Sequence, residues 1–187
     1  YIYNFWQDQN YQRGIWRRTT KESYLSGNPD WEILLNIDKL AEKDDIKWVF
    51  KGATGLFPEY NRFLVSLSKG GGDAVIVKEF DVSSKSFIED GFYLPEAKGS
   101  ASWIDKNTLM VSTDFGEGVT TSGYPMQVKI WKRGTDLSDA KEVFKGKEED
   151  MGIWGYTLPT ENKIYQLITR RTSFYSGDYY FIEKDKL

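Results

Sequence analysis

The carboxylates are the residues of this chain whose type and spacing could do chemistry. Two or three of them, held close together, could act as general acid and general base in glycoside hydrolysis. All four candidates stand in segments that read as turns, where aspartate commonly binds local backbone N–H groups. We therefore keep acid–base hydrolysis as an alternative and take turn capping as the simpler interpretation. The four residues are Asp81, Asp105, Asp114 and Glu117.

Histidine and cysteine are both absent from the 187 residues. Without histidine the chain lacks the commonest general base and cannot form a Ser-His-Asp triad, and no Gly-x-Ser-x-Gly nucleophile turn occurs. Without cysteine there is no thiolate metal site. The acidic run Glu148–Asp150 reads as a solvated linker, with metal binding as the alternative. We expect no catalytic residue, no cofactor and no metal site in this chain.

A glycine-rich segment, Ser68–Asp73, could be taken for a phosphate-binding loop. Such loops lead into a helix, whose N-terminal N–H groups hold the anion. Here the next segment, Ala74–Phe80, alternates as a strand does, and so does the preceding run Phe63–Leu67. The pattern therefore predicts a β-hairpin with the glycines in its turn.

Two polar segments are candidates for contacts with a peptide or with another domain. Arg17 and Arg18 are adjacent on an expected strand, so their side chains should point to opposite sides of the sheet. We expect one of them to pair with a carboxylate of a neighbouring unit, and steering of peptide carboxyl ends is the functional alternative. The polar segment Thr120–Pro125 precedes another strand, and such loops often carry function. Within it, Thr121 and Tyr124 are the candidate contact residues.

The elements that must position these residues form a repeat. An asparagine ends a short turn before an apolar run three times, at intervals of 46 and 55 residues, and a tryptophan lies upstream each time. Four short strands in about 45–55 residues is the period of a β-propeller blade. The 3.6-residue period of a helical repeat is nearly absent. The residues that define the repeat are Asn61, Asn107 and Asn162, with Trp48, Trp103 and Trp154.

The repeat predicts an all-β fold, a partial β-propeller of about three to four blades, each a four-stranded antiparallel sheet. A β-sandwich is the alternative, although it does not require this repeat. The tryptophans indicate packing between blades, and a peptide-stacking platform is the other interpretation. We expect a single domain over 1–187, divided into strands 2–4 of an incomplete blade (1–45), two blades (46–98 and 99–150) and strands 1–3 of another incomplete blade (151–187).

Within this division, three features of single elements are expected. The fourth strand of the 46–98 unit is expected over Phe87–Leu94, and the one plausible helical turn is Asp38–Asp45. The expected innermost strands, which contain the three tryptophans, hold no Asp or Glu, and this counts against a propeller glycosidase.

Charge and hydropathy narrow the possible partners. The net charge is −3 and the basic clusters are only pairs, such as Arg17-Arg18 and Arg170-Arg171, so we expect no nucleic-acid binding. No apolar run approaches the roughly 18 residues of a membrane span, so we expect no membrane partner. A cysteine-free chain fits a cytoplasmic location, while a periplasmic one stays open. The chain begins with Tyr1 inside a strand-like run, and we read it as part of a longer protein.

A set of sequence strings resembles one known family. YNFWQD, RGIWRRTT and PDWEILLNIDKLA stand near the start, and the most specific strings are LSKGGGDAVIVKEFDV and SGYPMQVKIWKRG. Together they resemble the amino-terminal propeller of prolyl oligopeptidase family serine peptidases, in particular bacterial prolyl endopeptidase-like members. The resemblance covers most of residues 1–135 and is more diffuse afterwards.

This resemblance implies a two-domain enzyme, in which an α/β-hydrolase domain carries a Ser, Asp and His triad. A seven-bladed propeller would cap the active site, admitting peptides and excluding folded proteins. No catalytic residue can be assigned to a position of this chain, so we expect it to be inactive alone. Its expected partners are its own catalytic domain and the peptide substrates, and open edges predict self-association. A free-standing propeller that binds proteins or peptides is the first alternative, and a propeller glycosidase is the second.

Overall fold

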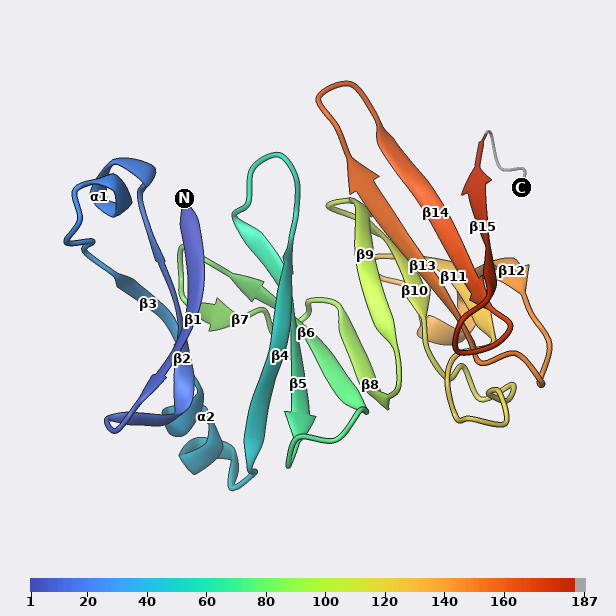
Figure 1. Cartoon of the computed structure of the whole chain (residues 1–187), viewed down its shortest axis with the longest axis horizontal. Coiled ribbons are helices and arrows are strands. Elements are labelled where there is room, and N and C mark those ends of the chain that lie inside the picture. Colours follow the sequence, from blue (N-terminus) through green and yellow to red (C-terminus); the bar gives the residue numbers. More distant parts are fainter. Residues whose placement is uncertain (184–187) are drawn as a thin grey trace.

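The computed structural model describes residues 1–183, in which four antiparallel sheets follow one another (Figure 1). The last expected unit, 151–187, therefore ends outside the described residues. The first sheet has the strand order β1-β2-β3, and the second has the order β4-β5-β6-β7 with β8 also paired to β6. Their strands are β1 (Ile2–Asp8), β2 (Tyr11–Thr19), β3 (Glu32–Asn36), β4 (Trp48–Gly55), β5 (Arg62–Lys69), β6 (Val75–Asp81), β7 (Ser86–Phe87) and β8 (Tyr93–Ala97).

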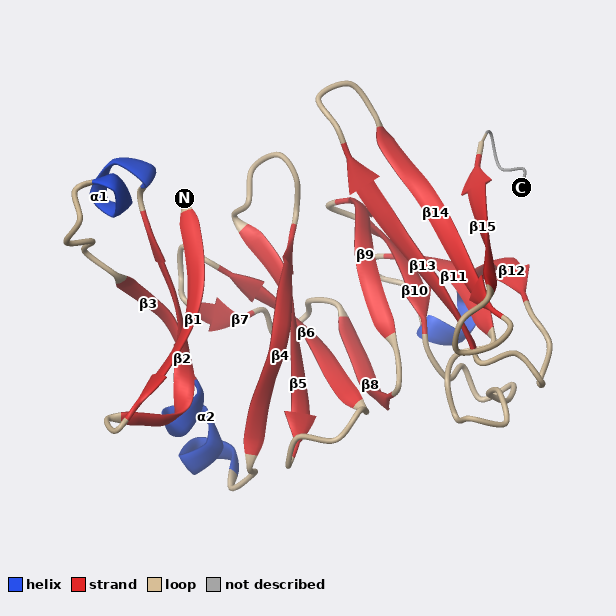
Figure 2. Ribbon diagram, in the orientation of Figure 1, coloured by secondary structure: helices blue, strands red, loops and turns tan. Residues whose placement is uncertain are grey.

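The third sheet has the order β12-β11-β10-β9 and the fourth has the order β13-β14-β15. All pairings are antiparallel meanders, and helices are short and peripheral (Figure 2). The all-β prediction is confirmed, and the row of separate sheets is that of a partial β-propeller. The strands are β9 (Ser100–Asp105), β10 (Thr108–Ser112), β11 (Gln127–Lys132), β12 (Lys141–Lys145), β13 (Gly152–Pro159), β14 (Ile164–Arg171) and β15 (Gly177–Ile182).

The hydrophobic core lies between neighbouring sheets. On β5, Phe63 and Val65 belong to the cluster shared with the first sheet, whereas Leu64 belongs to the cluster shared with the third. On β10, the same alternation puts Leu109 against the second sheet and Met110 against the fourth. Because successive side chains of a strand point to opposite faces, each central sheet buries both faces. This two-sided burial explains why the strands are rich in apolar residues.

The three recurring tryptophans all pack between neighbouring units, as one of the two interpretations predicts, and two of them are buried. Trp48 is buried in the core between the first and second sheets. Trp103 is buried between the second and third, and its Nε1–H donates to the Thr54 carbonyl of the neighbouring sheet at 2.9 Å. Trp154 is only half-buried and packs edge-on against Tyr124, with ring centroids 5.6 Å apart.

The helices are α1 (Lys21–Leu25) and α2 (Ile37–Asp44), and a single 3₁₀ turn covers Leu137–Asp139. The helical turn expected over Asp38–Asp45 is α2, which starts at the Asn36 side chain accepting the Lys39 N–H and buries Ile37 in the first core. Helix α1 was not expected. It has no buried residue, so no apolar periodicity marks it in the sequence.

Two sequence expectations are wrong in detail. The strand expected over Phe87–Leu94 is divided into β7 and β8, because residues between them turn to bring the Phe92 N–H onto the Glu79 carboxylate at 2.9 Å. The run Glu148–Asp150 is not solvated throughout, because Asp150 is buried and accepts hydrogen bonds from Arg170 Nε and Nη2, both at 2.9 Å. Arg170 lies on β14, 20 residues further along the chain, beyond the reach of a local sequence pattern.

A buried carboxylate, Glu79 on β6, connects the second and third sheets. It accepts hydrogen bonds from Arg62 at 2.8 Å and from both Nη atoms of Arg133, at 2.8 and 3.0 Å. Arg133 follows β11 and belongs to the third sheet. Burial alone would raise the pKa of Glu79, but the hydrogen bonds from Arg133, the Phe92 N–H and Arg62 outweigh it and hold the pKa below its usual value.

In the described residues, no helix is long and apolar enough to cross a membrane, and no group of three or more acidic side chains is arranged to hold a metal ion.

We predict that Glu79→Gln lowers the free energy of unfolding by about 1–3 kcal/mol, because two half-buried guanidinium groups lose the charged acceptor of their hydrogen bonds. The matched control is Glu96→Gln, which breaks the exposed Lys69–Glu96 pair of 2.8 Å and should cost under about 1 kcal/mol. Denaturant unfolding at neutral pH compares the two, and equal losses would contradict the role of Glu79.

The same carboxylate predicts a pH dependence. Since the folded state lowers the pKa of Glu79, its stabilisation is complete above the unfolded-state pKa of about 4.3 and is lost as the pH falls through the folded-state value. Stability curves between pH 6 and pH 3 should therefore fall less steeply for Glu79→Gln than for the wild type.

The outer face of the fourth sheet predicts self-association, because five large side chains on it are 36–63% exposed. At micromolar concentration we expect sedimentation of a dimer or larger species. The double substitution Tyr179→Ser with Phe181→Ser should shift it towards monomer, whereas Leu25→Ser on α1 should not. A 21.7 kDa monomer at every concentration would refute this prediction. The five side chains are those of Tyr156, Leu158, Tyr165, Tyr179 and Phe181.

Candidate functional site

The three turn aspartates accept hydrogen bonds from backbone N–H groups of their own turns, as predicted. Asp81 Oδ1 accepts the Ser84 N–H at 2.8 Å, Asp105 Oδ1 accepts the Asn107 N–H at 2.7 Å, and Asp114 Oδ1 accepts the Gly116 N–H at 2.8 Å. Glu117 instead pairs with Lys129 at 2.6 Å. These four carboxylates lie in or next to three separate loops, and each is occupied by a partner within 12 residues along the chain.

Loops of three successive sheets meet around Tyr124, at the edge of the sheets that lies at the bottom of Figure 1. The Tyr124 hydroxyl donates to Asp73 Oδ2 at 3.5 Å, and Lys98 Nζ lies 4.4 Å from the centre of the Tyr124 ring. Lys98 also donates to the Ser122 carbonyl at 3.1 Å. Trp154 of the fourth sheet also packs edge-on against the Tyr124 ring. We call Asp73, Lys98, Tyr124 and Trp154 the Tyr124 cluster.

The loop before β11 is held on both sides. Near Tyr124, the Thr121 N–H donates to the Glu148 carbonyl at 2.9 Å, and the Thr120 hydroxyl donates to the Met151 carbonyl at 3.2 Å. Further back, Glu117 binds the buried Lys129, and this hydrogen bond is the main cause that lowers the pKa of Glu117. The loop therefore presents Tyr124 in a defined position between the third and fourth sheets.

Arg17 and Arg18 lie on opposite sides of β2, as the strand geometry predicts. Arg17 lies between two indoles, with its guanidinium carbon 4.7 Å from the Trp6 ring centre and 4.3 Å from that of Trp31. Arg18 Nε donates to Glu32 at 2.6 Å. The expected partner in a neighbouring unit is wrong, because Glu32 belongs to the same sheet.

The neighbouring unit contributes a cation instead of a carboxylate. Lys85, which follows β6, binds the other Glu32 oxygen at 3.0 Å. The hydrogen bonds from Arg18 and then Lys85 lower the pKa of Glu32. One carboxylate thus links the first and second sheets through two cations.

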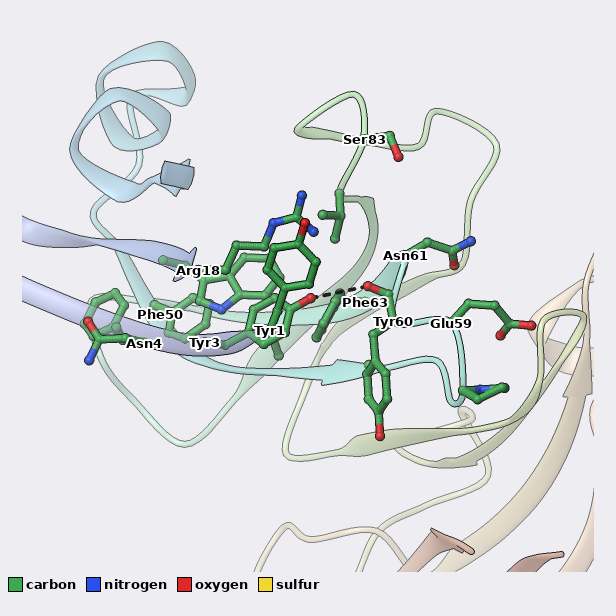
Figure 3. A pocket seen from close by; sticks show the side chains of 16 residues that line it. Tyr1, Tyr3, Asn4, Arg18, Phe50, Glu59, Tyr60, Asn61, Phe63 and Ser83 are labelled. Carbon is green, nitrogen blue, oxygen red and sulfur yellow. Dashed lines mark hydrogen bonds between the residues drawn. The ribbon is translucent and has the colours of Figure 1, made fainter. Parts of the chain in front are cut away.

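Arg18 also lines a cleft of about 700 Å³ between the first and second sheets, which we call the Arg18 cleft (Figure 3). Tyr3 of β1 lies beside Phe63 of β5, and the Tyr3 hydroxyl donates to the Tyr60 carbonyl at 3.4 Å. Burial is the main cause that raises the pKa of Tyr3. The cleft walls come from segments 57 residues apart in the chain, so no local pattern could have indicated them.

The predicted contact residues thus occupy three places. Thr121 and Tyr124 lie together in the loop of the Tyr124 cluster, Arg18 lies in the Arg18 cleft, and Arg17 lies on the opposite face of the first sheet. Sequence reasoning missed Asp73 and Lys98 as neighbours of Tyr124. Asp73 ends the glycine turn that was singled out, whereas nothing in the sequence marks Lys98.

Nearly the whole chain matches one known protein family. The sequence profile described as "prolyl oligopeptidase, N-terminal beta-propeller domain" matches residues 1–180. The chain belongs to the prolyl oligopeptidase family, within its N-terminal β-propeller domain. The resemblance noted in the strings is confirmed, and it extends well beyond residue 135.

The relatives are peptidases by name. A peptidase of Sinorhizobium fredii is 46% identical over 151 residues, which cover 80% of this chain and 21% of the relative. One from Rickettsia prowazekii is 31% identical over 194 residues, covering 98% of this chain and 27% of the relative. The solved post-proline cleaving enzyme of Rickettsia typhi is 32% identical, with a TM-score of 0.89 over 97% of this chain and 28% of that one. The chain thus spans about a quarter of the length of these proteins.

We predict that Tyr124→Ala lowers the free energy of unfolding by about 1–2 kcal/mol, because it removes ring packing on Trp154 and Lys98. Tyr124→Phe keeps the ring and loses only a long hydrogen bond, so it should stay within about 0.5 kcal/mol of the wild type. Denaturant unfolding, with hydrogen exchange of the loop amides, measures both. Similar effects of the two substitutions would show that the ring does not hold the loop.

Proposed function

We propose that this chain is the non-catalytic, access-shaping part of a prolyl oligopeptidase-like serine peptidase that cleaves short peptides. Its membership of the family's propeller domain carries the proposal. The names of the relatives support a peptidase as the whole protein. Because a triad needs a histidine and this sequence has none, the hydrolytic groups would come from an α/β-hydrolase domain outside these residues.

The Tyr124 cluster is the surface that we assign to this role. It gathers a carboxylate, an ammonium group and one aromatic ring from loops, with a second ring from β13 of the fourth sheet. Such loops can vary in chemistry while the sheets stay rigid. Its side chains could bind the catalytic domain or orient an entering peptide. The charged groups would favour polar peptide backbones, and the rings would offer flat apolar contact.

The first test compares this chain with the product of the complete reading frame that contains it. On a chromogenic peptide with proline before the scissile bond, we expect hydrolysis by the complete product and none by residues 1–187. Hydrolysis by the chain alone would refute the non-catalytic role. A complete product that binds such peptides without cleaving them would favour the free-standing binding module.

Within an active complete protein, Lys98→Ala should change kcat/KM for the peptide about 3–10-fold, because Lys98 holds the Tyr124 loop and contributes charge there. The matched control is Lys106→Ala, an exposed lysine in the turn between β9 and β10, at the opposite edge of the same sheet. The control should leave kcat/KM unchanged. Equal effects of the two substitutions would exclude the cluster from peptide access.

A further inference from the structure

We propose that the Arg18 cleft binds the carboxyl-terminal end of a short peptide, with Arg18 as the carboxylate contact. This inference rests on the proposed function, in that it takes peptides to be the ligands of the whole protein. The cleft is lined in part by residues 58–61 of the loop between β4 and β5. That loop lies at the edge of the sheets opposite the loops between β5 and β6 and between β10 and β11 (Figure 1). The cleft would therefore be a second peptide contact, separate from the Tyr124 cluster.

The size and walls of the cleft suit a peptide. Its volume of about 700 Å³ falls within the range of small-ligand sites. Its floor is the buried Trp16, whose ring stacks on Tyr3 with centroids 5.8 Å apart and meets Phe63 edge-on at 4.9 Å. These interlocked rings form a rigid apolar surface for a flat proline or aromatic side chain. Asn61 lies on the rim, where its amide could bind a peptide backbone.

The charges along the cleft are complementary to a peptide with a free carboxyl end. At one end, Arg18 and Lys85 share the single carboxylate of Glu32, which leaves one positive charge in excess. Arg18 binds Glu32 through its Nε, and its guanidinium carbon lies 4.2 Å from the centre of the Tyr1 ring. A second carboxylate would bind the terminal nitrogens, in the plane of the guanidinium group. At the other end stands the exposed acid Glu59, which would attract the amino-terminal side of the ligand (Figure 3).

Arg17 provides an internal comparison, because the neighbouring arginine has the same charge and faces the other side of the sheet. It is occupied by Asn4 Oδ1 at 2.9 Å and by the two indoles, and it does not line the cleft. A ligand attracted only by positive charge would respond to both arginines. A ligand seated in the cleft would respond to Arg18 alone.

The test is a titration of the chain with the tripeptide Ala-Pro-Phe as the free acid and as its carboxyl-terminal amide, followed by amide chemical shifts and calorimetry. For the wild type we expect at least five-fold tighter binding of the acid, with shifts concentrated in β1 and at residues 59–61. Arg18→Gln should remove the difference between acid and amide. Arg17→Gln should preserve it.

A further variant keeps the test decisive if Arg18→Gln unfolds the first sheet. Tyr60→Asn removes an exposed ring at the cleft and tolerates the positive φ of 48° at that position, so it should weaken acid and amide alike by about three-fold or more. Equal binding of acid and amide to the wild type, or shifts confined to the Tyr124 cluster, would overturn the proposal. Because this readout is binding, its failure is distinct from a failure of the activity test above.

Discussion

No sheet of this chain can cover its own faces, and the rest of the structure follows from that constraint. A sheet of three to five strands has two apolar faces and encloses nothing, so the core forms only where one sheet packs on the next. Burial on both sides brings polar groups into the junctions, where they must be paired. Glu79 with Arg133 serves this purpose between the second and third sheets, and Glu32 with Lys85 joins the first and second.

Both candidate sites are consequences of these junctions. The Arg18 cleft opens where the first and second sheets diverge, and the Tyr124 cluster lies where loops of the second, third and fourth sheets converge. The third and fourth sheets pack closely at Gly155, where there is no room for a side chain. A Cβ there would lie 2.5 Å from Val128 and 2.7 Å from Met110, so the third and fourth sheets can meet at this point only over a glycine. Because the sheets hold the loops in place, the side chains of the loops can differ in chemistry without changing the fold.

Sequence patterns predicted what depends on near neighbours. The glycine turn at Ser68–Asp73, the opposite directions of Arg17 and Arg18 and the short helix after Asn36 all follow from local alternation or capping, and all three are present. The predictions were wrong where a residue distant in the sequence changes the local structure. The strand expected over Phe87–Leu94 is interrupted by a hydrogen bond to Glu79, and Asp150 is buried by Arg170.

The sequence by itself therefore determined the class of the fold, the repeat of about fifty residues and the family, since each is written in periodicity and in contiguous strings. Only the tertiary structure decided which side chains meet. Asp73 and Tyr124 are 51 residues apart, with Lys98 between them, and Tyr3 and Tyr60 are 57 residues apart. Their contacts depend on how one sheet is rotated and placed on the next, and no single strand carries that information.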